Sequence, residues 1–138
     1  MFKKTITYTD YNDVERTEDF YFNLTRMELT EMSFAGMVDK LQNAIDTQDA
    51  TAMVSIFKDL IFKSYGEKSE DGKRFVKSEE LSTAFSQTEA YSTFVVELMT
   101  EADMSTKFVE GLFSADVLKQ IRVAQEAQPK MITDTSRG

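Results

Sequence analysis

The chain has 138 residues and a formal net charge of -8, from 24 acidic and 16 basic side chains. Cysteine and histidine are both absent, which excludes disulfides, zinc–thiolate sites, imidazole ligands and histidine-dependent catalytic triads. The acidic balance argues against nucleic acid as a partner, because phosphate binding works through Lys and Arg. No apolar run has the roughly 20 residues of a membrane span. We therefore expect a protein-binding role with no cofactor, and neither an enzyme nor a membrane protein.

The first 24 residues predict a β-hairpin. Apolar and polar residues alternate over residues 2–9, which is the period of a strand with one apolar face. Residues 10–13 are rich in Asp and Asn, which favour turns. A second alternating run follows over residues 19–24. The predicted inward-facing side chains are Phe2, Ile6, Tyr8, Phe20, Phe22 and Leu24.

From residue 25 the apolar residues recur at the spacing of amphipathic helices. Residues that favour helix N-caps precede these segments. They are Thr25, Asp49, Ser78, Thr88, Asp103 and Ser114. Glu28 completes a capping box with Thr25, Gly66 is placed to end the helix over residues 53–65, and Pro129 is placed to end the last helix.

The predicted fold class is α+β and mostly α, with an N-terminal β-hairpin followed by five or six amphipathic helices in one compact domain. We expect a single globular domain over residues 1–129, divided into the hairpin at 1–24 and a helical part at 25–129. Residues 130–138 have no pattern and are predicted to be a flexible tail.

The polar segment over residues 67–77 is the best candidate for a metal site. If Gly72 is aligned with the sixth position of a calcium-binding EF-hand loop, the twelfth position is Ser78, where the motif requires Glu. The segment therefore predicts an ordinary solvated loop. We expect no catalytic, cofactor or metal site in the chain.

Three segments carry a resemblance to a known family. They are residues 20–25 (FYFNLT), residues 63–75 (KSYGEKSEDGKRF) and residues 85–91 (FSQTEAY). Together with the residues between them, over about residues 5–115, the chain resembles tail-assembly chaperones of long-tailed bacteriophages that infect Gram-positive bacteria. None of these segments is a catalytic signature, and the likeness lies in their combination and order.

The resemblance implies binding of the tape measure protein, which the chaperone keeps soluble while tail tube subunits polymerise around it. It also implies several chaperone copies per partner and contact with the tail tube protein through a frameshifted longer form. The expected location is the host cell cytoplasm and not the mature virion. The alternative is a virion structural or connector protein of the phage tail or head–tail junction. An acidic adaptor that mimics DNA charge and an uncharacterised enzyme are weaker alternatives.

Two surfaces are candidates for contacts with other chains. Val54, Phe62, Val96 and Phe113 lie off the main apolar stripes, which suggests a partner groove between the helices over residues 53–65 and 91–102. The predicted partner-binding residues are Phe57, Phe62, Tyr65, Phe94, Val96, Met99 and Phe113, and core packing is the alternative role for each. The predicted self-association edge is formed by Thr5, Thr7 and Thr9 of the hairpin.

Overall fold

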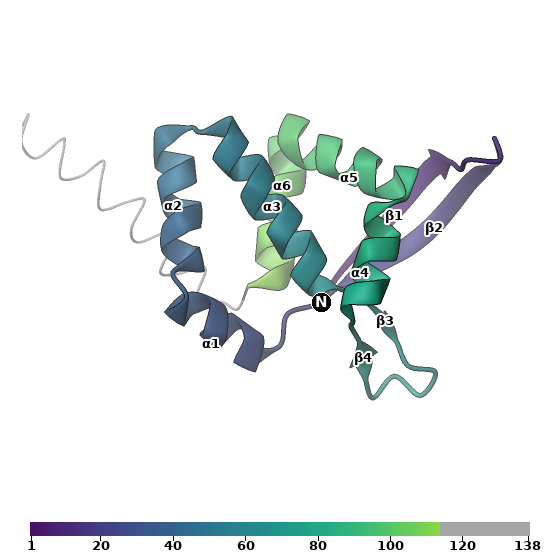
Figure 1. Ribbon diagram of the computed structural model, residues 1–138, viewed down its shortest axis with the longest axis horizontal. Coiled ribbons are helices and arrows are strands. Elements are labelled where there is room, and N and C mark those ends of the chain that lie inside the picture. The colour runs from purple at the N-terminus through teal and green to yellow at the C-terminus, as the bar shows by residue number, and fades with distance from the viewer. Residues whose placement is uncertain (114–138) are drawn as a thin grey trace, which may run out of the picture.

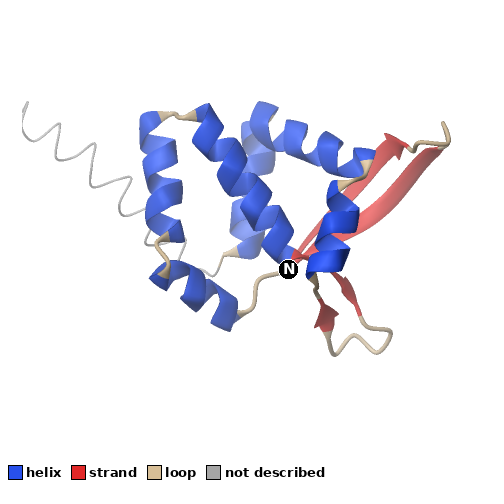
Figure 2. Cartoon of the chain, viewed as in Figure 1, coloured by secondary structure: helices blue, strands red, loops and turns tan. Residues whose placement is uncertain are grey.

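The computed structural model describes residues 1–113, and Figure 1 shows its elements in chain order. The strands are β1 (Phe2–Thr9), β2 (Glu15–Phe22), β3 (Tyr65–Lys68) and β4 (Phe75–Val76). The helices are α1 (Arg26–Phe34), α2 (Met37–Thr47), α3 (Ala50–Ser64), α4 (Glu79–Ser86), α5 (Glu89–Thr100) and α6 (Ala102–Leu112). Figure 2 separates the helices from the strands, and the predicted hairpin-plus-helices α+β fold is confirmed. The last predicted helix, from Ser114 to Pro129, and the predicted tail lie outside the described residues.

The hairpin folds as its alternating pattern predicts. β1 and β2 pair in antiparallel register from Phe2 opposite Phe22 to Thr9 opposite Glu15. In the turn, Asp10 Oδ1 accepts hydrogen bonds from the backbone N–H groups two and four residues later. The apolar side chains of both strands therefore face the helices, and the threonines of β1 face outward.

The sheet has two strands that the sequence analysis missed. Its order is β1-β2-β3-β4, and β3 joins β2 with Tyr65 opposite Phe22. The prediction that α3 runs to Tyr65 and ends with Gly66 as its cap is wrong, because the helix ends at Ser64. Gly66 has a different reason to be glycine: a Cβ there would lie 2.5 Å from the carbonyl oxygen of Val76. The close approach of β4 therefore requires a residue without a side chain.

Side-chain caps begin most of the helices. Thr25 and Glu28 exchange the two hydrogen bonds of a capping box at the start of α1. Three further predicted caps are confirmed, because each accepts a hydrogen bond from a backbone N–H three residues on. They are Asp49, Ser78 and Thr88. The predicted cap at Asp103 is wrong: α6 begins at Ala102, and Asp103 lies in its first turn, where its charge favours the helix dipole.

An aromatic core lies between the hairpin and the helices. The Phe22 ring is fully buried, with ring centroids 5.2 Å from Phe94 on α5 and 5.7 Å from Phe108 on α6. Phe57 of α3 joins the same cluster through Phe108. Helices α4, α5 and α6 therefore contact the hairpin directly. Helix α3 packs behind them against α4 and α5, and α2 joins the same core through α3 and carries α1 (Figure 1).

Candidate partner-binding surfaces

The predicted groove between α3 and α5 is not open, because the two helices pack against each other. Phe57 is 2% exposed, Phe94 is 0% exposed and Phe113 is 6% exposed, so the structure places all three in the core. Phe57 and Phe94 lie on amphipathic stripes, which show that a helix packs on something but do not distinguish the protein's own core from a partner. Phe113 lies off the stripe in the sequence, but it follows the last residue of α6 and is buried there. For these three residues the alternative of core packing is the one that the structure supports.

The remaining predicted partner-binding residues divide into two pairs. Tyr65 and Met99 are half-buried, and the Tyr65 ring stacks on Phe85 with centroids 4.4 Å apart. Phe62 and Val96 are 42% and 59% exposed on the outer sides of α3 and α5. These two side chains are available for contact, as their off-stripe positions predicted. Val54, also off the stripe, is half-buried.

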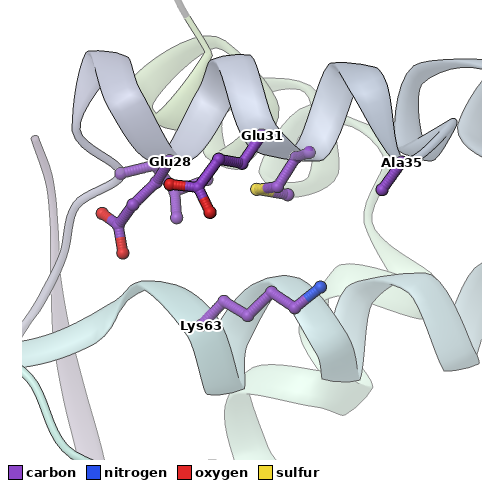
Figure 3. A pocket seen from close by; sticks show the side chains of 6 residues that line it. Glu28, Glu31, Ala35 and Lys63 are labelled. Carbon is purple, nitrogen blue, oxygen red and sulfur yellow. The ribbon is translucent and has the colours of Figure 1, made fainter.

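A cleft that the sequence analysis missed lies between α1 and α3 (Figure 3). Its volume is about 350 Å³. The lining residues are Leu24, Glu28, Glu31, Met32, Ala35 and Lys63. Figure 3 shows the glutamates and Ala35 on one wall and Lys63 on the facing wall. The cleft exists because α1 packs mainly against α2 and leaves the end of α3 uncovered, an arrangement that no local pattern reveals.

Hydrogen bonds fix one wall of the cleft. Burial by itself raises the pKa of Glu28, but hydrogen bonds from the Lys77 ammonium and the Thr25 backbone N–H outweigh it and hold the pKa below its ordinary value. Lys77 Nζ also donates to the backbone oxygen of Asn23 at 2.8 Å. The ionised Glu28 therefore joins α1, the β2–α1 loop and the segment after β4 into one rigid corner.

The other charged groups of the cleft are free to meet a partner. Glu31 and Lys63 are exposed and form no salt bridge within residues 1–113. Below them, Leu24 and Met32 are 6% and 8% exposed and provide an apolar floor. A floor of this kind, with one acidic and one basic group at its rim, suits an apolar anchor side chain of a partner helix with charged neighbours.

The predicted self-association residues lie on the outermost strand of the sheet. Thr5, Thr7 and Thr9 are exposed on β1, which the strand order places at one end. Across the hairpin, Thr5 Oγ1 donates to Asp19 at 2.6 Å and Thr7 Oγ1 lies 2.9 Å from Thr17 Oγ1. These side chains are thus held on the face of the hairpin opposite the helices.

Among residues 1–113, no three acidic side chains gather in a way that could hold a metal ion. Within the same part of the chain, no helix combines the length and the apolar character needed to cross a bilayer.

The chain matches a known protein family. The model of a family described as phage tail assembly chaperone matches residues 1–137, nearly the whole chain. No curated protein and no solved structure matches the chain. The family match agrees with the resemblance drawn from the sequence.

Proposed function

Because the chain belongs to the phage tail assembly chaperone family, we propose that it binds the tape measure protein, keeps it soluble and supports polymerisation of the tail tube around it. Membership of the family gives the general role in tail assembly, and the role of a chaperone is non-catalytic. The named partner and the order of events belong to the proposal. So do action in the host cell cytoplasm, absence from the mature virion, and contact with the tail tube protein through a frameshifted longer form.

The observation that best supports binding of a long helical partner is the cleft between α1 and α3. An amphipathic helix presents apolar anchors every three or four residues, and a concave apolar floor accepts one or two of them. The cleft is short, so each copy of the chaperone holds only a short part of the partner. A long partner would therefore bind several copies along its length, each through the same small contact.

Co-expression with the tape measure protein tests the proposed function. We expect the tape measure protein to become soluble and to elute together with several copies of this chain in size-exclusion chromatography with light scattering. If it stays insoluble and this chain elutes alone, the proposed function is wrong. Mass spectrometry of purified virions then tests the alternative, because a connector protein is present there in fixed copy number and a chaperone is absent.

A bulky substitution in the cleft tests the proposed binding site. Ala35 is exposed and lines the cleft, so Ala35→Trp fills part of the space without disturbing the core. Ala84→Trp is the matched control, because Ala84 is exposed on α4, outside the residues that line the cleft. We expect Ala35→Trp to lower recovery of soluble tape measure protein at least several-fold and Ala84→Trp to leave it unchanged. Equal recovery with the two folded variants would place the binding site elsewhere.

A further inference from the structure

The free edge of β1 has a defined set of backbone groups that β2 does not use. The Asp10 N–H donates to the Val14 carbonyl at 2.9 Å, which continues the β1–β2 register by one position. Opposed pairs in an antiparallel ladder alternate between hydrogen-bonded and non-hydrogen-bonded. The even-numbered residues of β1 therefore bond to β2. The backbone groups of the odd-numbered residues point away from it: Lys3, Thr5, Thr7 and Thr9.

A second hydrogen bond independently indicates that the even-numbered residues of β1 bond to β2. On the other side of β2, the Asn23 N–H donates to the Ser64 carbonyl at 2.8 Å, in register with the β2–β3 pairs. Odd-numbered residues of β2 thus turn toward β3 and even-numbered ones toward β1. Because Phe22 lies opposite Phe2, the even-numbered residues of β1 are again the ones bonded to β2.

Among the described residues, Lys3 and Lys4 are the only features of this edge that commonly block pairing with another strand. β1 is eight residues long, contains no proline and keeps a continuous register without a bulge. Its one inward-facing charge, Lys4, is paired with Glu97 of α5 at 2.8 Å. The loop end of the hairpin projects beyond the helices (Figure 1). The opposite edge of the sheet, β4, has only two residues and offers much less to pair with.

The sequence of β1 is compatible with pairing to a second copy of itself. The edge-facing residues must lie opposite each other, and the antiparallel register that pairs all four of them places Thr5 opposite Thr7 of the second copy and Lys3 opposite Thr9. Ile6 then faces Ile6 of the second copy, and no lysine faces a lysine. A shifted register that places Lys4 opposite Lys4 of the second copy shortens the ladder and brings two like charges together.

We propose that two copies of this chain associate through their β1 edges in this register and form one continuous antiparallel sheet. The edge-facing N–H and C=O groups of each copy then bond to those of the other, and the outward threonines form adjacent cross-strand pairs. This inference concerns the chain alone and holds whether or not the tape measure protein is the partner.

Two double variants with matched chemistry test the register. In Thr5→Lys/Thr7→Lys, a lysine faces a lysine of the other copy at both central positions. In Thr5→Lys/Thr7→Glu, a lysine faces a glutamate at both. Within one chain the two variants lose the same threonine hydrogen bonds, and both place a lysine opposite Asp19. Circular dichroism and thermal unfolding should therefore show the same fold for both.

Sedimentation equilibrium of the full chain measures how strongly each variant dimerises. We expect the wild type to dimerise, Thr5→Lys/Thr7→Lys to dimerise about tenfold more weakly or worse, and Thr5→Lys/Thr7→Glu to dimerise at least as well as the wild type. A wild type that stays monomeric at every concentration overturns the proposal. Equal dimerisation of the two variants, including loss of the dimer in both, also overturns it.

Discussion

Removal of the Phe22 ring is the sharpest test of the core. Phe22 is 0% exposed, and its ring centroid lies between 5.2 and 6.1 Å from those of Phe2, Phe85, Phe94 and Phe108. Phe22→Ala removes buried apolar surface and leaves a cavity whose rigid aromatic walls cannot easily collapse, which costs about 3–5 kcal/mol. Domains of this size have total stabilities of about 5–15 kcal/mol. We therefore expect a large loss of the free energy of unfolding, with a folded but marginal protein.

Urea and thermal unfolding followed by circular dichroism measure this loss. We expect the urea midpoint of Phe22→Ala to fall by roughly 2 M and the melting temperature by roughly 10–20 °C. Phe62→Ala is the control, because Phe62 is 42% exposed and the same substitution there removes only about 1 kcal/mol of burial. If the two variants lose equal stability, the fully buried cluster around Phe22 is not the centre of the core.

Three further predictions concern β3, the hairpin and the exposed apolar residues. Gly66→Ala places a Cβ 2.5 Å from a backbone oxygen of β4, so we expect a loss of about 1–3 kcal/mol and faster hydrogen exchange in β3 and β4. The hydrogen bond to Glu18 raises the pKa of Tyr8 from 10.0 to about 12. The hydrogen bond stabilises the folded state fully below pH 10, and this stabilisation is lost as the pH rises to 12. Over that range Tyr8 of the unfolded chain is already ionised, while Tyr8 of the folded chain still holds its proton. Glu18→Gln should return the pKa toward 10.0 in a tyrosinate absorbance titration, and an unchanged titration would contradict the bond. Phe62→Asp and Val96→Asp should leave the melting temperature nearly unchanged and reduce recovery of soluble tape measure protein; full recovery would remove both from the contact surface.

The parts of the fold that the sequence predicts are those determined by neighbouring residues. The hairpin follows from the alternation in β1 and β2 and from the turn chemistry around Asp10. Three helix starts follow from side chains that accept a hydrogen bond three residues on, at Asp49, Ser78 and Thr88. Each of these signals depends on contacts within a few residues, so the sequence displays it directly.

The parts that it did not predict depend on residues far apart in the chain. β3 is a strand because Tyr65 and Gly66 meet β2, which lies more than 40 residues earlier in the sequence. The helix-like pattern through residue 65 carries no information about this pairing with β2. The same limit applies to the predicted groove: the apolar stripes of α3 and α5 are real, but the two helices pack against each other, so Phe57 and Phe94 lie in the core. The α1–α3 cleft also depends on residues far apart in the chain, because it forms where two helices lie near each other without packing tightly.

The free edge of β1 and the α1–α3 cleft are formed by different elements and share no residue. A chain with this arrangement can pair with a second copy while its cleft remains open to a partner helix. The two sets of variants therefore separate self-association from partner binding. One outcome is that Thr5→Lys/Thr7→Lys abolishes the dimer and also lowers recovery of soluble tape measure protein, while Ala35→Trp lowers recovery but leaves the dimer intact. In that case the weak contact of each single copy is strengthened by association of the copies along the partner. If the first variant loses only the dimer, each copy binds the partner independently, and self-association contributes nothing to the affinity.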